Sequence, residues 1–288
     1  MKPSTMLELA ELLPGMLDQL EDSIYIMKVE GGNFTYVYVN RMATRFSGVS
    51  MKDVGLSFEE TNKSPQMAGY LHHNYTRVLT ERKPIRFEDG VLMPNGMLSG
   101  ESLLTPIMDD DGEVQYIISV TRDTTERKRN EEQLRNYAYH DELTKLFNRR
   151  YLLEHVTNPL VLCMFDLDHF KKINDNHGHD TGDMVLVEVA SRLHSHFNSE
   201  YILIRLGGDE FIVATHVDCE DSPERMAERI MSMFDMPFTL QDGKMRLSAS
   251  IGVAVRYNNE DIHALLKQAD VALYRAKGAG RKRFCMYG

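Results

Sequence analysis

The chain contains no tryptophan and only three cysteines among its 288 residues. The lack of tryptophan weakens the case for a flavin domain that packs an indole against the ring, without excluding one. Cys163, Cys219 and Cys285 are widely spaced and form no CxxC pair, so we assign none of them to metal binding or catalysis. Cys163 lies in an apolar run, where we expect it to act as a small buried hydrophobe. Because no cysteine precedes Cys163, the sequence excludes a photoreceptor with a flavin–cysteine adduct in the first half of the chain.

Long apolar runs and an excess of basic residues are also missing. No apolar run reaches the roughly 18 residues that cross a bilayer, and the N-terminus lacks the apolar core of a signal peptide. We therefore expect a cytoplasmic protein with no membrane span. The net charge of −10 and the pI of 5.6 argue against a partner that is a nucleic acid polymer, because such binders need a basic surface. Any nucleotide has to bind at a local site. The length predicts about two domains.

The first half of the sequence predicts a domain with five strands and short helices. Apolar residues at helical spacing over 6–20, interrupted by Pro14-Gly15, predict a short amphipathic helix. A second helix is expected over 66–79. The glycines of Gly31-Gly32-Asn33 predict a hairpin between the first two strands, and Asp109–Gly112 predicts a turn between the last two. The predicted strands span 23–29, 34–39, 85–92, 99–107 and 114–121.

This succession of elements resembles a PAS domain, and we place it at residues 1–122. The resemblance rests on Asn40–Gly48, on Val54-Gly55 and on Asp123–Arg127. It implies a sensor that binds a small ligand or a cofactor, or that dimerises; the cofactor stays unknown. His72 and His73 lie on the second predicted helix, where a histidine can in principle reach a haem iron. A solvated or hydrogen-bonded histidine is the preferred interpretation.

A charged segment over 123–140 predicts a helical connector. Asp123 followed by Glu126 resembles a capping box with aspartate in the Ser/Thr role, and good helix formers follow. Leu134 and Tyr137 are too few to establish a coiled coil. The helix therefore either pairs with its twin in a dimer or remains a solvated single-helix linker.

The second half is organised around Arg205-Leu-Gly-Gly-Asp-Glu-Phe211, which lies between two strand-like segments and predicts a β-hairpin. Gly207 and Gly208 can adopt backbone angles closed to other residues, and they let a bulky ligand approach the main chain. Asp209 and Glu210 place two carboxylates at the turn, which suits a hard divalent cation. An isolated motif of this kind would be read as a solvated surface hairpin.

The flanking elements predict helices packed on a mainly antiparallel sheet. The apolar run 160–165 is typical of a buried strand and stops at Asp166, so that an acid stands at the strand end. We expect a short helix over 168–175, then a longer helix capped by Asp180-Thr-Gly-Asp183. The remaining predicted elements are a helix over 222–234, a strand over 247–255 and a helix over 261–277. Both halves together predict the α+β fold class.

Several motifs in order over 141–283 resemble the GGDEF family of diguanylate cyclases. They are Asp141–Arg150, Asp166–Asp175, Gly178–Asp183, Arg205–Phe211 and Ala269–Lys277. The resemblance implies a domain at 141–288 with the palm-like, ferredoxin-type fold of nucleotidyl cyclases. It also implies an enzyme that condenses two GTP into cyclic di-GMP, as a homodimer with two Mg²⁺ per active site. Receptors of cyclic di-GMP would be its indirect downstream partners.

The resemblance also implies roles for individual residues. It assigns metal binding to Asp166, the carbonyl of Leu167, Asp209 and Glu210, and catalytic roles to Glu210, Asp209 and Lys171. Substrate binding is assigned to Phe170, Lys171, Asn174, Asp183, Gly207, Gly208, Lys277 and Arg281. Of these, Phe170 and Lys171 open a helix whose free amides favour phosphate. Asn174 and Asp183 match the guanine-reading positions, since guanine offers O6 as an acceptor and N1–H and N2–H as donors.

Two departures from the family pattern have consequences. Lys145 stands where glycine is more usual. Asn198-Ser-Glu-Tyr201 replaces the Arg-x-x-Asp that many relatives carry as an inhibitory product site, so product feedback is expected to be absent or weak. Two other functions remain in view: a catalytically silent regulatory protein that binds GTP or cyclic di-GMP, and a dimerising scaffold. The acids together with Lys171 and Asn174 favour the enzyme.

Overall fold

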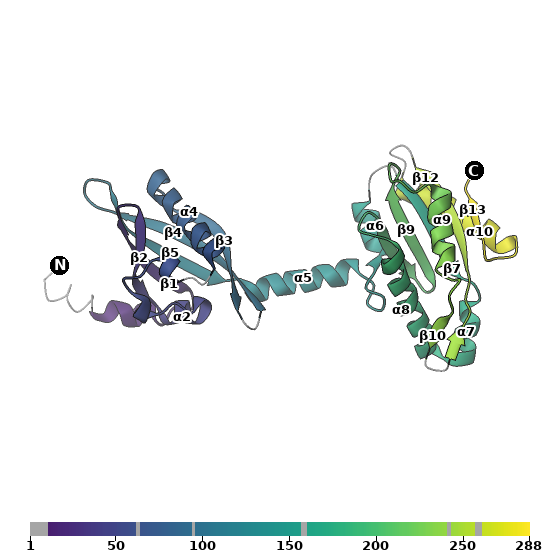
Figure 1. Cartoon of the computed structure of the whole chain (residues 1–288), viewed down its shortest axis with the longest axis horizontal. Coiled ribbons are helices and arrows are strands. Elements are labelled where there is room, and N and C mark those ends of the chain that lie inside the picture. The colour runs from purple at the N-terminus through teal and green to yellow at the C-terminus, as the bar shows by residue number, and fades with distance from the viewer. Residues whose placement is uncertain (1–10, 62–63, 94–95, 157–159, 241–242, 257–260) are drawn as a thin grey trace. The chain divides into compact units, whose positions relative to one another are not determined.

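The computed structural model describes residues 11–61, 64–93, 96–156, 160–240, 243–256 and 261–288 (Figure 1). The chain forms two compact units, Met1–Glu132 and Gln133–Gly288. Of the helix predicted over 6–20, residues 6–10 lie outside the described residues, and residues 11–17 are helical. The helix runs through Pro14-Gly15, which was predicted to interrupt it, because the carbonyl of Pro14 still accepts a bond from the amide of Asp18 at 3.0 Å.

The first unit contains an antiparallel five-stranded sheet in the order β2-β1-β5-β4-β3. All five strands and the predicted helix over 66–79 are confirmed. The strands are β1 Ser23–Glu30, β2 Asn33–Val39, β3 Ile85–Met93, β4 Gly96–Met108 and β5 Val114–Asp123. The helices are α2 Arg41–Ser47, η1 Met51–Asp53, α3 Phe58–Thr61 and α4 Pro65–Glu81.

Asn40 explains why α2 begins where β2 ends. Its buried Oδ1 accepts bonds from the amides of Ala43, at 2.8 Å, and Ile24, at 2.9 Å. Its Nδ2 donates to the carbonyls of Leu17 and Asp22, both at 3.0 Å. One side chain thus caps a helix and fixes two neighbouring segments, which is a use that asparagine serves well at a helix start.

The core of the first unit is aromatic and encloses a cavity of about 50 Å³. Tyr75 meets Phe34 and Phe58 edge to face and the two phenylalanine rings are tilted against each other, with ring centroids 4.8 to 5.9 Å apart. The cavity lining includes Ser119 and Thr121 from β5, and among the described residues that line it none is charged. His72 does not line this cavity; its Nδ1 lies 3.3 Å from a carboxylate oxygen of Glu59. The hydrogen-bonded interpretation of His72 is therefore confirmed.

The predicted connector helix is α5, Thr125–Tyr139. Oδ1 of Asp123 accepts a bond from the amide of Thr125 at 2.8 Å. The amide of Lys128 bonds to the carbonyl of Thr124, so the helix begins one residue later than the predicted capping box with Asp123 at the N-cap requires. Leu134 and Tyr137 are three positions apart and share one side of the helix, where they are 68% and 69% exposed. This exposed apolar pair is the feature that a second copy of the helix would cover.

The second unit contains a six-stranded sheet in the order β13-β12-β7-β9-β8-β6 (Figure 1). The pairs β6·β8 and β12·β13 are parallel, and the other neighbours are antiparallel. The sheet strands are β6 Phe147–Asn148, β7 Leu160–Leu167, β8 Ile202–Gly207, β9 Glu210–His216, β12 Ala249–Arg256 and β13 Phe284–Met286; β10 Phe238–Leu240 and β11 Gly243–Met245 form a separate hairpin. The helices are α6 Arg149–His155, α7 Phe170–His177, α8 His179–His196, α9 Pro223–Ser232 and α10 Ile262–Gly278. The expected α+β class and the mainly antiparallel sheet are confirmed.

Helices cover both faces of this sheet because β7 is apolar on both sides. Its residues Val161, Cys163 and Phe165 face the cluster that includes α8 and α9. The alternate residues Leu160, Leu162 and Met164 face the cluster that includes α6 and α10. This alternation is the two-residue period of a strand. Cys163 is fully buried, as predicted, and burial raises the pKa of its thiol.

Two predicted boundaries were wrong. The helix expected over 168–175 begins at Phe170, because Asp168 still belongs to the sheet edge and donates its amide to the carbonyl of Ser248 at 2.8 Å. Asp180–Asp183 does not cap the next helix. It forms the first turn of α8, whose N-cap is Gly178 at φ 84°. Among the described residues, no helix has the length and apolar character needed to span a membrane.

Candidate active site

The sheet register brings the predicted acids to one edge. Asp166 near the end of β7 lies directly opposite Glu210, the first residue of β9. The hairpin predicted around Gly207-Gly208 is confirmed: the ladder shifts between Arg205 and Gly207, and the glycines take φ values of 144° and 56°. These left-handed angles suit glycine, and they turn the chain so that Asp209 stands between the two strands.

The acids at this edge influence one another. Burial raises the pKa of Asp209, and the charge of Asp166 raises it further. Burial also raises the pKa of Glu210, followed by the charges of Asp166, Asp209 and Asp270, while Lys277 opposes the shift. Three carboxylates held this close repel each other when ionised, so the edge attracts cations.

Lys277 supplies one such cation. Lys277 belongs to the last turn of α10, and its Nζ lies 2.7 Å from Oδ2 of Asp166. The Asp166 side chain is 14% exposed. The ammonium therefore occupies a position where positive charge is stabilised by the acids. This contact was not foreseen, although Lys277 was predicted to serve the substrate.

Arg205 ties the hairpin turn to the segment that opens the domain. Its Nε and Nη2 donate to the carbonyl of Gly208 at 3.1 and 2.8 Å, and its Nη1 lies 2.9 Å from Oδ1 of Asp141. The same Oδ1 accepts bonds from the amide and hydroxyl of Thr144. Lys145, the residue found where glycine is more usual, closes this opening turn at φ 61°, a conformation that glycine adopts without strain.

The edge fits magnesium when part of the coordination comes from a substrate. Among the described residues, no group of three or more His, Cys, Asp or Glu side chains has an arrangement that could hold a metal ion by itself. Mg²⁺ is commonly held by one or two carboxylates together with phosphates and water, so two acids suffice. Lys277 on Asp166 shows that a positive charge is accommodated here. Leu167 at the end of β7 has a buried, apolar side chain, so its backbone carbonyl is the part of this residue that can bind a metal.

A second corner gathers the residues predicted to read the base. Phe170 and Asn174 lie on α7, and Gly182 and Asp183 lie on the first turn of α8. Asn174 contacts Gly182 so closely that a Cβ placed there would lie 1.9 Å from its Oδ1 and 3.2 Å from Cζ of Phe170. Asp183 follows Gly182 and is exposed. The structure thus brings Asn174 next to the turn of α8 that carries Asp183.

The start of α7 is open, as expected of a phosphate site. Its N-cap is His169 at φ 62°, which makes no side-chain capping bond within the described structure. Lys171, at the second position of the helix, is exposed. The amide of Lys172 already donates to the carbonyl of His169 at 2.9 Å, so the amides before it at the helix start are the ones that can meet solvent or an anion.

Arg281, which was predicted to share the distal phosphate contacts with Lys277, lies next to Asp168 in the structure. It lies beyond α10 at φ 61°, and its Nε is 4.0 Å from Oδ1 of Asp168. Asp168 is 6% exposed, and its carboxylate accepts bonds from the hydroxyls of Ser248 and Ser250 and from the amide of Lys282. Asp168 thus anchors the loop that carries Arg281.

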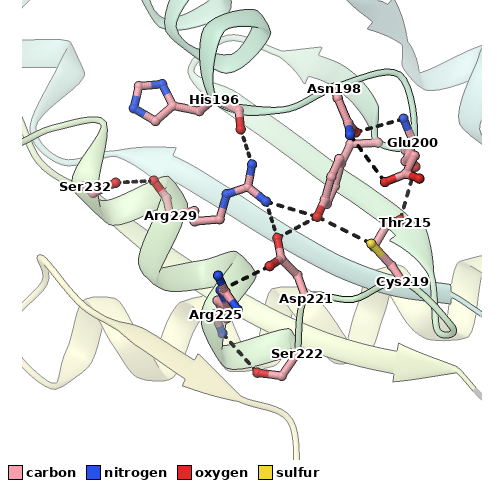
Figure 2. Close-up of polar contacts among 11 residues, drawn as sticks. His196, Asn198, Glu200, Thr215, Cys219, Asp221, Ser222, Arg225, Arg229 and Ser232 are labelled. Atoms are coloured by element: carbon pink, nitrogen blue, oxygen red, sulfur yellow. Dashed lines mark hydrogen bonds and ion pairs between the residues drawn. The ribbon is translucent and has the colours of Figure 1, made fainter.

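The segment that replaces the inhibitory motif lines a pocket of about 350 Å³, and a polar network around Arg229 forms part of the lining (Figure 2). The guanidinium of Arg229 on α9 binds Asp221, the hydroxyl of Tyr201 and the carbonyl of His196. Its Cζ lies 4.5 Å above the ring of Phe197. The hydrogen bond from Tyr201, and then the charge of Arg229, lower the pKa of Asp221 against the opposing effect of burial.

Two residues of the site were missed from the sequence. Asp270, which raises the pKa of Glu210, lies seven residues before Lys277 and therefore on the same side of α10. That spacing is a signal that could have identified it. Arg205 stood within the quoted hairpin motif, but its partner Asp141 is 64 residues away, and no local pattern links them.

Comparison with known proteins agrees with this geometry. The family described as "Diguanylate cyclase, GGDEF domain" matches residues 138–283, and the one described as "PAS fold" matches residues 17–129. The chain is 38% identical to the Escherichia coli diguanylate cyclase DgcM over 181 residues, 59% of this chain and 43% of that one. It is 35% identical to the E. coli cyclic di-GMP phosphodiesterase PdeR over 181 residues, 60% of this chain and 27% of that one.

Among solved structures, the GGDEF domain of Pseudomonas aeruginosa TpbB matches 52% of this chain and 95% of its own, with 33% identity and a TM-score of 0.49. The chain spans less than half the length of the two curated relatives. The matched residues 138–283 make up half of the 288-residue chain. The chain therefore belongs to the GGDEF family, with a PAS domain as its N-terminal unit.

Proposed function

We propose that this protein is a diguanylate cyclase. In this reaction the 3′-oxygen of one GTP attacks the α-phosphorus of another, a new phosphodiester bond forms, and the bond to the β-phosphate breaks with release of pyrophosphate. A second, reciprocal attack closes cyclic di-GMP. The enzyme acts in the cytoplasm, and receptors of cyclic di-GMP carry its signal onward.

The observation that carries this proposal is the convergence of Asp166, Asp209 and Glu210 at one sheet edge. The raised pKa values of Asp209 and Glu210 report that these acids are partly desolvated and within electrostatic reach of Asp166. A scaffold gains nothing from partly desolvated, mutually repelling carboxylates, because they lower stability. Such strain is typical of a functional site.

The residues of this chain divide the work of binding GTP. The open amides at the start of α7 and the charge of Lys171 bind the β- and γ-phosphates. Lys277 lies close enough to Asp166 to turn from that carboxylate to a phosphate oxygen when substrate arrives. Arg281 reaches the phosphate tail from the loop after α10. Gly207 and Gly208 leave the hairpin turn without side chains, so the nucleotide can approach its backbone.

Asn174 and Asp183 read the guanine. The carboxylate accepts from N1–H and N2–H, and the amide binds O6. Adenine carries an amine at position 6 and no hydrogen on N1, so it mismatches both groups. Glu210 accepts the proton of the attacking hydroxyl, a role that its pKa, raised above that of an ordinary glutamate by burial and by the charge of Asp166, supports.

Magnesium, two ions per site, would be held by Asp166, Asp209, Glu210 and the carbonyl of Leu167, and when bound would screen the triphosphate and acidify the attacking hydroxyl. Each catalytic unit holds one GTP, so the reaction requires a homodimer that brings two units face to face. The exposed pair Leu134 and Tyr137 on α5 supports pairing of connector helices.

The PAS domain regulates this alignment by binding a small uncharged molecule. The cavity of about 50 Å³, its aromatic lining and its hydroxyl groups support a ligand of this class. A cavity of roughly 150 Å³ is needed for benzene, so haem or flavin would require a large expansion of the core. An absorption spectrum of the purified protein without haem or flavin bands is the expected result.

One assay tests the proposed activity. The purified protein is incubated with GTP and Mg²⁺, and cyclic di-GMP and pyrophosphate are measured beside Asp209→Ala and the control Asp235→Ala. Asp235 is an exposed aspartate of the same unit, distant in sequence from every proposed site residue. Product from the parent and from Asp235→Ala, but not from Asp209→Ala, supports the cyclase. Binding of GTP without product would select the silent regulator, and no GTP binding would select the scaffold.

A further inference from the structure

The contact between Asn174 and Gly182 contains a feature that the proposed roles leave unexplained. Oδ1 of Asn174 is buried, and it has no hydrogen-bond partner in the described part of the chain. A buried unpaired carbonyl is costly, so something has to hold the amide in this orientation. The packing around Gly182 identifies what holds it.

Gly182 receives the buried oxygen. It is the fourth residue of α8, and its backbone is ordinary helix, so glycine is not needed there for its backbone freedom. Alanine is the better helix former at such a position. What glycine provides is space, because a Cβ would lie 1.9 Å from Oδ1 and 3.0 Å from Cγ of Asn174. Real Cβ atoms do not approach other atoms so closely, so alanine would force the amide to move.

The buried oxygen fixes which end of the amide meets a ligand. Oδ1 and Nδ2 are on opposite branches of the same planar group, so burying Oδ1 against Gly182 turns the NH₂ group outward. An outward NH₂ group donates, and O6 is the acceptor on the guanine edge read here. Asp183, the residue after Gly182, is an acceptor for the neighbouring N1–H and N2–H donors. The start of α8 thus carries the acceptor Asp183 and, at Gly182, packs against the donor Asn174.

We propose that Gly182 is a positioning residue for base recognition: its missing side chain holds the Asn174 amide with its NH₂ group directed at O6 of the substrate purine. This inference rests on the proposed function, since it concerns the same nucleotide site. It adds a residue that acts through Asn174, and it specifies which atom of the base Asn174 reads. The chemical class selected is a 6-oxopurine nucleotide, whether or not position 2 carries an amine.

Three nucleotides separate the atoms involved. GTP and ITP both carry O6, while the triphosphate of 2-aminopurine riboside lacks it and keeps the 2-amine. Each is used in its 3′-deoxy form, which lacks the attacking hydroxyl and so reports binding alone. Dissociation constants are measured by calorimetry for the full chain and for Gly182→Ala, Asn174→Ala and the double variant. Gly69→Ala is the matched control, because Gly69 is also an interior glycine of a helix and has open space around its Cβ position.

Gly182→Ala is expected to raise the dissociation constants of the GTP and ITP analogues about tenfold, the factor that one hydrogen bond commonly supplies. Binding of the 2-aminopurine nucleotide should be unchanged, and so should all binding by Gly69→Ala. The double variant should bind no worse than Asn174→Ala, because without the amide a Cβ at position 182 meets nothing to displace. The double variant also removes the clash, so it reports on the proposal even if Gly182→Ala folds poorly.

Normal binding of the 6-oxopurine analogues by Gly182→Ala would overturn the proposal, as would an equal loss for all three nucleotides. Additive losses in the double variant would show that Gly182 acts independently of Asn174 and would also overturn it. A failure of the proposed function looks different: the unaltered protein would then bind none of the three nucleotides, or would bind them and form no cyclic di-GMP from GTP and Mg²⁺.

Discussion

Lys277 forms an ion pair with Asp166, with 2.7 Å between Nζ and Oδ2, and thereby joins the last turn of α10 to the end of β7. The two residues are 111 positions apart, and only the antiparallel pairing of β12 with β7, with α10 packed beside them, brings them together. The contact shows that the acid edge holds a positive charge from the protein itself. It also places the Lys277 ammonium beside the proposed metal and phosphate positions.

Replacing Lys277 by methionine removes this charge while keeping the apolar stem. We expect the dissociation constant for 3′-deoxy-GTP with Mg²⁺ to rise about tenfold, because a charge-assisted contact to phosphate is lost. Calorimetry measures the change. Lys172→Met, which removes an exposed lysine from α7, is the control and should bind normally. Equal binding by Lys277→Met and the parent would mean that Lys277 serves Asp166 alone.

Glu210→Gln tests the proposed proton acceptor. The amide retains the size and one oxygen but accepts no proton at neutral pH, so turnover should fall by about 10²-fold or more if Glu210 is the general base. Rates of pyrophosphate release give turnover, and a parallel titration with Mg²⁺ gives metal affinity. Full turnover with normal metal affinity would exclude the role of general base.

The network around Asp221 predicts a pH dependence of stability. Hydrogen bonding from Tyr201 lowers the pKa of Asp221 below 3.8, so the folded state binds fewer protons than the unfolded state. The stabilisation is therefore complete above about pH 5 and disappears as the pH falls through the folded-state pKa. Asp221→Asn should lose about 1 to 2 kcal/mol of unfolding free energy at pH 7, since an ionic hydrogen bond is replaced.

Urea denaturation at pH 7 and pH 5 should give the same difference between Asp221→Asn and the parent, and the difference should shrink near pH 3. Asp218→Asn is the control, because the Asp218 side chain is 84% exposed and its carboxylate lies 3.1 Å from Nδ1 of the exposed His216. A difference that grows on acidification would contradict the sign argued here.

Cyclic di-GMP should find no second site near Asn198–Tyr201. This segment lacks the arginine and aspartate of the inhibitory motif, and the nearby Arg229 is occupied by Asp221, Tyr201 and the carbonyl of His196. Calorimetry with the active site filled by 3′-deoxy-GTP should show no binding of cyclic di-GMP at micromolar or better affinity. Tight binding under these conditions would mean that the pocket beside Arg229 opens to the product.

The sequence predicted most of the fold, because its long elements have a clear local pattern. The continuous apolar run of β7 and the glycines of the hairpin were both sufficient. The strands β6 and β13 were not predicted, since two or three residues carry no period. The start of α7 was misplaced because the burial of Asp168 depends on Ser248 and Ser250, some 80 positions later.

The site divides in the same way. Motif resemblance pointed to the acids and to Asn174, and the structure brings Asp166, Asp209 and Glu210 to one edge. It did not point to Arg205, whose importance lies in its contact with Asp141, or to Gly182, whose importance lies in an absent side chain. Neither property is visible in local sequence. Both arise only when distant segments pack.

The bridge made by Arg205 sets a limit on which substitutions position 205 tolerates. One planar guanidinium spans a backbone carbonyl in the hairpin turn and a carboxylate at the threshold of the domain. Lysine offers a single ammonium point and lacks the fork needed to reach both acceptors. Replacement by lysine would thus conserve the charge at position 205 but lose the connection between the hairpin turn and Asp141.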